Sequence, residues 1–395
     1  MFMGVNVYNF LILDFFIITI ILTSLFGLGA GFFENIYIIC LAFFMVGVSF
    51  GGNLPIAGVL LLESIPPSKQ SLLTLLSVWW PVGQVLASVI SWMTLSESNS
   101  CVGNVGDYCS PALNYGWRHV CYYFSAVTVI SAFLGYLFNL RETPKYLVSV
   151  GKYEDAVNFL NKLAHENGKI LKITAADFEI SRKTQKRKDV ESKSKLGRIK
   201  PLFIKELRVT TILIWFIWMF VAIGYNMFNV CLPGFLQHSG AETLGLSETY
   251  RNYVIVSFSS IPGSIVGMFL TDSKLGRKGT MAFATGSTAL ALLLFTKFTS
   301  PTGQLVMGSI NGSLQNLMYG VIYAYTPEVF PTSIRNTAYG IAASVGHLSG
   351  AVAPFATFSL INLSYLFPIY CSSAIILIAA FLMLCLPDVN KVYVK

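Results

Sequence analysis

Ten long apolar runs, separated by short polar segments, restrict most strongly how this chain of 395 residues can fold. A helix needs about 20 mostly apolar residues to cross the hydrocarbon core of a membrane, and each run is long enough. Only 12% of the residues are charged, which is too few to cover a soluble protein of this length. We therefore predict an all-α polytopic membrane protein. The predicted spans are 10–31, 36–60, 70–94, 118–140, 209–233, 251–271, 279–298, 302–326, 334–360 and 364–386.

The formal net charge of +8 lies entirely in the segment 141–208, which has 17 Lys and Arg residues against 9 Asp and Glu residues. If this segment is cytosolic, 24 of the 27 Lys and Arg residues are cytosolic, in agreement with the positive-inside rule. Both termini are then predicted to be cytosolic. Few aromatic residues accompany these bases, so we expect a solvated loop and no nucleic-acid partner.

This basic segment divides the predicted spans into four before it and six after it. We therefore predict an N-terminal half at 1–140, a basic cytosolic linker with short helices at 141–208, and a C-terminal half with a short cytosolic tail at 209–395. The predicted architecture is a two-half helical bundle.

A short motif occurs twice, after the second and after the eighth predicted span. In both copies an acidic residue, Glu63 or Glu328, is followed three positions later by proline, then by serine, and then by a base. Both copies lie at the predicted cytosolic end of a span. Repetition across half a chain is typical of transporters built from two related halves.

The turn between the sixth and seventh predicted spans offers charged partners for these carboxylates. Arg277 can bind a carboxylate through two N–H groups, and Asp272 can accept hydrogen bonds from the N-terminus of a neighbouring helix. Such contacts would hold the cytosolic face closed, and breaking them would let the halves rock. The predicted cytosolic gate consists of Glu63, Asp272, Arg277, Glu328 and Arg335. The alternative is that these charges only fix the topology.

Polar side chains within spans are costly and usually face the protein interior or a water-filled path. In the eighth predicted span Asn311, Gln315 and Tyr319 follow each other at steps of four and share one helix face. The third and fifth spans carry further polar residues. The predicted substrate-binding residues are Gln84, Tyr225, Asn226, Asn311, Gln315 and Tyr319. The alternative is that they form hydrogen bonds between packed helices.

No motif of the sequence indicates catalysis or nucleotide binding. Residues 276–279 read Gly-Arg-Lys-Gly but lack the spacing of a phosphate-binding loop. No Ser/His/Asp cluster stands out, and no Cys/His spacing indicates a metal site. We therefore expect neither enzyme activity, nor a cofactor, nor a bound metal.

Several motifs resemble those of the sugar-porter branch of the major facilitator superfamily. Residues 325–332 followed by Arg335 resemble the branch's signature, 272–278 resembles the turn between its eighth and ninth helices, and 141–147 resembles its Pro-Glu-Ser-Pro-Arg motif. Further runs are most similar to synaptic-vesicle-glycoprotein-like and organic-ion-transporter-like members. These runs are 47–52, 79–83 and 117–118.

The resemblance implies a sugar transporter-like, multi-pass protein of the lipid bilayer, monomeric, in a plasma membrane or a vacuole-type organelle membrane. It implies secondary transport of a small polar organic solute, such as a sugar or an organic ion, by alternating access, with a coupling proton left open. By motif order the first span corresponds to the family's third helix, so we expect the chain to lack the family's first two helices and its N-terminal half to be incomplete relative to the family. The alternative is a truncated or degenerate transporter-like protein that does not transport and acts through interactions.

Overall fold

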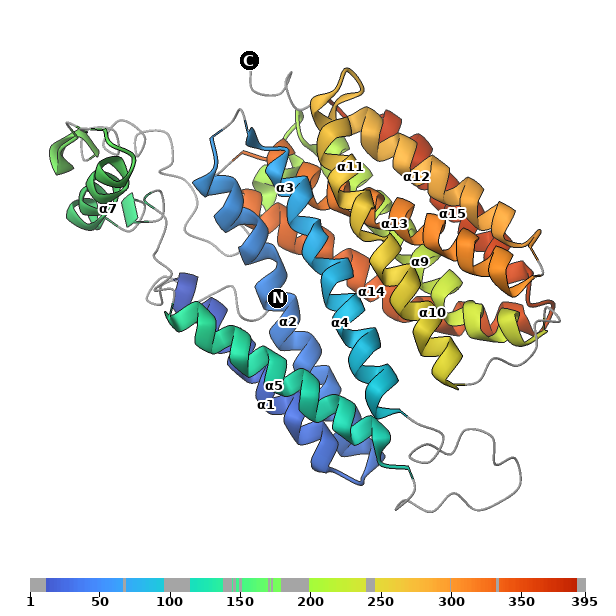
Figure 1. Cartoon of the computed structure of the whole chain (residues 1–395). Helices are drawn as coiled ribbons and strands as arrows, with labels where there is room; N and C mark the ends of the chain where they lie inside the picture. The colour runs from blue at the N-terminus through green and yellow to red at the C-terminus, as the bar shows by residue number, and fades with distance from the viewer. Residues whose placement is uncertain are drawn as a thin grey trace. The chain divides into compact units, whose positions relative to one another are not determined.

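Helices occupy all ten predicted spans (Figure 1), and the described residues contain no strand. The computed structural model describes residues 12–66, 69–95, 114–137, 144, 147–148, 151–169, 171, 173–178, 199–238, 246–298, 300–331 and 334–388. The helices are α1 (Ile12–Phe32), α2 (Ile36–Ser64), α3 (Leu72–Leu75), η3 (Leu76–Val78), α4 (Trp79–Thr94), α5 (Gly116–Leu137), α7 (Tyr153–Glu166), η5 (Lys200–Phe203), α9 (Arg208–His238), α10 (Leu246–Ser259), α11 (Ile261–Asp272), α12 (Gly276–Phe295), α13 (Pro301–Val329), α14 (Arg335–Ile361) and α15 (Phe367–Leu384).

Six helical segments of the described chain are long and apolar enough to cross a membrane. They are Leu72–Thr94, Arg208–Leu232, Ser247–Asp272, Gly276–Phe295, Arg335–Ile361 and Phe367–Leu384. Two shorter apolar helices, Ile17–Phe32 and Ile36–Gly51, belong to α1 and α2. The predicted all-α multi-pass class is confirmed, whereas the count of ten spans stays a prediction.

The chain forms two compact units. The first comprises Met1–Pro67 and Phe124–Pro201, with α1, α2, most of α5, and α7; the second comprises Ser68–Tyr123 and Leu202–Lys395, with α3, η3, α4 and α9 to α15. The grouping differs from the order of the sequence because α3 and η3 pack on α11 and α13, and α4 packs on α10. The predicted division into two halves and a linker at 141–208 is a division of the sequence and stays a prediction.

In the first unit, small residues bring α1 close to α5. The Ser24 hydroxyl donates to the carbonyl of Ser125 over 3.1 Å, and a Cβ added at Gly27 would lie 2.9 Å from the Ser125 hydroxyl. At the connection between α1 and α2, the Asn35 side chain accepts a hydrogen bond from the backbone N–H of Tyr37 and caps α2. Small-residue contacts and caps of this kind let apolar helices pack closely.

In the second unit, the sixth predicted span breaks into α10 and α11 at Ser260. Pro262 lies at the start of α11, where its missing N–H removes one helical hydrogen bond across the break. Side chains of α13 bond to the carbonyls at this break: the Ser313 hydroxyl donates to Ser259, and the Asn316 amide donates to Ser260 over 3.0 Å. Membrane helices can break where neighbours satisfy the freed backbone groups in this way.

This contact between α11 and α13, with η3 beside it, depends on small residues. Gly263 lies directly against the backbone of Ser313, and Gly320 lies against the side chain of Ser77. The hydroxyls of Ser77 and Ser264 share a hydrogen bond of 2.8 Å. We call this contact the α11–α13 seam; it fixes the rotation of α13, and therefore which of its side chains face away from α11.

Candidate transport site

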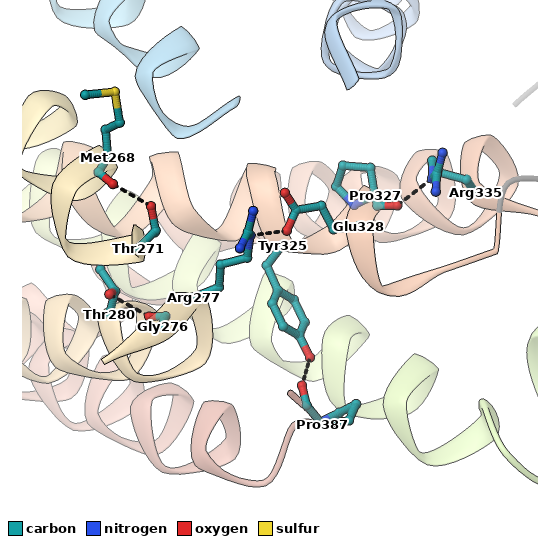
Figure 2. A network of polar contacts seen from close by, with 10 residues as sticks. All are labelled: Met268, Thr271, Gly276, Arg277, Thr280, Tyr325, Pro327, Glu328, Arg335 and Pro387. Atoms are coloured by element: carbon teal, nitrogen blue, oxygen red, sulfur yellow. Dashed lines mark hydrogen bonds and ion pairs between the residues drawn. The ribbon is translucent and has the colours of Figure 1, made fainter. Parts of the chain in front are cut away.

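A buried ion pair joins α12 to α13 at the end that we predict to be cytosolic. The Arg277 guanidinium pairs with the Glu328 carboxylate, and their side chains are only 16% and 1% exposed (Figure 2). Gly276 has a φ of 64°, a conformation that glycine adopts easily, and this turn places Arg277 in the first turn of α12. Since a buried carboxylate loses its hydration, it needs such a partner.

Two further contacts connect neighbouring helices to the same end of α13 (Figure 2). The Nε atom of Arg335, the first residue of α14, donates to the carbonyl of Pro327 over 2.6 Å. The Tyr325 hydroxyl donates over 2.7 Å to the carbonyl of Pro387, which follows α15. The end of α13 is therefore the point at which α12, α14 and α15 are tied together.

The five predicted gate residues have different outcomes. Arg277, Glu328 and Arg335 gather at the end of α13. Asp272 is exposed at the end of α11, and it forms no ion pair with any residue that the structure describes. Glu63 belongs to α2, but its side chain lies outside the described residues, so its role stays a prediction.

Two of the predicted substrate-binding residues have unusual surroundings. Asn311 and Gln315 are 2% and 8% exposed, and one polar atom of each amide is buried with no hydrogen-bond partner among the described residues. The adjacent Asn316 differs, because its amide donates to both Ser260 and Ser264. Buried polar groups are nearly always paired, so the two unpaired amides mark a place for a polar ligand or for water.

A group of aromatic rings surrounds Tyr319, which lies one helical turn from Gln315, and we call it the aromatic cluster. Its members come from α4, α9, α13 and α14: Trp80, Trp218, Tyr225, Tyr319, Tyr323 and Tyr339. The Trp80 ring lies 4.6 Å from Tyr323, the Tyr225 ring 5.3 Å from Tyr319, and the Trp218 ring 4.7 Å from Tyr323. Interplanar angles of 76°, 89° and 66° make these edge-to-face contacts, a preferred arrangement of aromatic rings.

Two predicted substrate-binding residues, Asn226 and Gln84, have different surroundings. The Asn226 amide donates over 2.8 Å to the carbonyl of Ala222 in its own helix, and Gln84 is exposed on α4. Conversely, Trp218 and Tyr339 were not predicted from the sequence to be site residues. Their signal was an aromatic residue within a span, which by itself does not distinguish a site from helix packing.

Comparisons with known proteins show which family the chain belongs to. The sequence matches the family described as "Major Facilitator Superfamily" over residues 13–354 and again over 214–393. It is 31% identical over 398 residues to an uncharacterized MFS-type transporter of Schizosaccharomyces pombe, covering 94% of this chain and 71% of that protein. It is 32% identical over 388 residues to MFS siderochrome iron transporter 1 of Ceriporiopsis subvermispora, covering 94% and 74%.

Among solved structures, the fold is similar to that of the proton:xylose symporter XylE bound to 6-bromo-6-deoxy-D-glucose. The TM-score is 0.71 at 16% sequence identity, over 96% of this chain and 83% of the symporter. The predicted resemblance and the predicted secondary transport are thus confirmed. The chain belongs to the Major Facilitator Superfamily, as a sugar-porter-like secondary transporter of small solutes.

Proposed function

We propose that this protein carries a small polar organic solute across the membrane by alternating access, and that the Arg277–Glu328 pair locks its cytosolic side. The observation that carries the proposal is the burial of this pair at the end of α13, where α14 and α15 are also held. In this proposal the ends of these helices, which all belong to the second unit, separate when that side opens, and this motion loosens the pair. A buried ion pair between two helix ends can form in one conformation and break in the other.

The solute would bind on the α13 face that carries Asn311, Gln315 and Tyr319, with Tyr225 of α9 against Tyr319. Glu328 lies nine residues beyond Tyr319 on the same helix, which is about 14 Å along its axis. A solute that shifts or rotates α13 would therefore act on the pair directly, through one helix. This supports a coupling between the binding face and the lock.

The names of the relatives support an organic cargo, because they mention siderochrome iron and xylose. The xylose transporter is named a proton symporter, so a pH gradient is a variable that any transport assay of this protein should include. In the predicted orientation both termini are cytosolic, and the Arg277–Glu328 pair lies at the cytosolic end of the helices. In an importer driven by an inward proton gradient, this is the side on which the protons would be released.

The proposal is tested by uptake into proteoliposomes. A panel of radiolabelled sugars, organic cations, organic anions and small amides should contain at least one solute that enters saturably and faster than into protein-free liposomes. Each solute is measured with and without an inward pH gradient. If no solute of the panel enters above the background, the result contradicts transport and favours the alternative of a transporter-like protein that acts through interactions.

A further inference from the structure

We propose that the aromatic cluster, together with Asn311 and Gln315, binds a neutral, flat, ring-shaped solute that carries an amide or a similar hydrogen-bonding group. The inference rests on the proposed function in one respect: this ligand would be the transported solute. Three properties of the site specify this class, namely its rings, its unpaired amides and the lack of Asp, Glu, Lys and Arg in the described helical segments that carry it.

The rings favour an aromatic ligand. The cluster brings together side chains from four helices. Its ring centroids are 4.6 to 6.3 Å apart, and its contacts are edge-to-face except for the tilted pair Tyr319–Tyr323. Trp80 and Tyr225 are partly exposed, whereas Tyr339 is buried, so the cluster has an accessible side and a closed side. A flat aromatic ring can join such a cluster through both its edge and its face, whereas a saturated ring offers C–H groups but no π face of its own.

The amides favour a ligand that can both donate and accept hydrogen bonds. Asn311, Gln315 and Tyr319 are successive residues of one face of α13, so each amide is one helical turn from the next polar group. An amide side chain carries an acceptor on one side and donors on the other. A ligand group with both properties satisfies the unpaired atom in either orientation of the side chain. A carboxamide is the simplest such group.

The surroundings favour a neutral ligand. The helices that form the cluster have no Asp, Glu, Lys or Arg at 79–94, 209–231, 301–327 or 336–361. A charged ligand at this site would lose hydration without a countercharge, and this is expensive in a buried environment.

Benzamide is the probe that combines all three properties. Its affinity for the purified protein in detergent is measured by isothermal titration calorimetry, beside those of cyclohexanecarboxamide, benzoate and glucose. We expect benzamide to bind about tenfold more tightly than cyclohexanecarboxamide, which has the same amide on a saturated ring, because aromatic contacts contribute on that scale. Benzoate and glucose should bind more weakly still. Equal affinity for the saturated amide or for benzoate, or no benzamide binding, would overturn the inference.

Neighbouring residues provide matched controls. Gln315→Leu should weaken benzamide binding at least tenfold without lowering the unfolding temperature, because it removes a buried amide that has an unpaired atom. Asn316→Leu should lower the unfolding temperature, because that amide bonds to Ser260 and Ser264. Likewise Trp80→Leu should weaken binding, whereas Trp79→Leu, at a side chain 67% exposed, should not. Unchanged benzamide affinity in Gln315→Leu and Trp80→Leu would contradict this site.

The binding experiment and the uptake experiment can contradict the two proposals independently. If other solutes enter proteoliposomes but benzamide binds no better than its saturated analogue, the proposed function stands and this inference is wrong. If benzamide binds with the expected preference but neither benzamide nor any other solute is taken up, the site exists and transport is contradicted.

Discussion

Arg277→Ala should abolish measurable uptake and lower the unfolding temperature of the purified protein. The substitution leaves the carboxylate of Glu328, whose side chain is 1% exposed, without its guanidinium partner. Breaking a buried ion pair by removing one member costs about 3–5 kcal/mol. The measurements are initial uptake rates in proteoliposomes and thermal unfolding in detergent. Lys278→Ala is the matched control, because Lys278 is the next base of the same turn and forms no ion pair with the described residues.

A double variant distinguishes a role of the Arg277–Glu328 pair in opening and closing from a role in stability alone. Replacing both Arg277 and Glu328 with leucine removes the unpaired charge and should restore most of the unfolding temperature, since apolar replacements of buried pairs are often neutral or stabilising. Uptake should stay absent, because a permanent apolar contact cannot open and close as an ion pair does. A double variant that transports normally would show that the pair serves stability alone.

The helices of this chain could be predicted from its sequence because the bilayer imposes a length on every span. The ends predicted for 334–360 and 302–326 lie within three residues of the ends of α14 and α13. The break at Ser260 was not predicted, although Pro262 stands beside it. Proline is tolerated inside α13, at Pro327, and inside α14, at Pro354, so its presence alone does not show where a span divides. The neighbours that satisfy the freed carbonyls decide this, and they come from another helix.

Some residues of the candidate site could be predicted from the sequence and others could not, because contacts with other helices decide which side chains are paired. Arg277 and Glu328 could be matched because opposite charges at the same end of adjacent spans have few other partners. Gln315 and Asn316, by contrast, are neighbours of almost identical chemistry, yet one has an unpaired atom and the other bonds to α11. Which of them faces α11 depends on the rotation of α13. That rotation follows from the glycines of the seam, and no pattern of hydropathy reveals it.

Gly263→Ala should therefore have one of the largest effects on stability of any small substitution in this chain. A Cβ at this position would overlap the backbone carbonyl of Ser313, and a backbone group cannot turn aside as a flexible side chain can. The two helices must separate, which should cost about 3 kcal/mol and lower the unfolding temperature by several degrees. In a membrane the effect is not offset by hydrophobic burial, since helices there associate through close packing and hydrogen bonds.

Gly308→Ala is the control for this substitution. Gly308 also lies in α13, but the nearest atom to its added Cβ, on Val256, is 3.7 Å away, at ordinary contact distance. Alanine favours a helix over glycine by up to about 1 kcal/mol, so this variant should be as stable as the wild type or slightly more stable. If Gly263→Ala unfolds at the wild-type temperature, the α11–α13 seam does not determine the packing of α13. If it is destabilised as expected, the surviving folded fraction should also bind benzamide more weakly, because a displaced α13 moves Gln315 relative to the aromatic cluster.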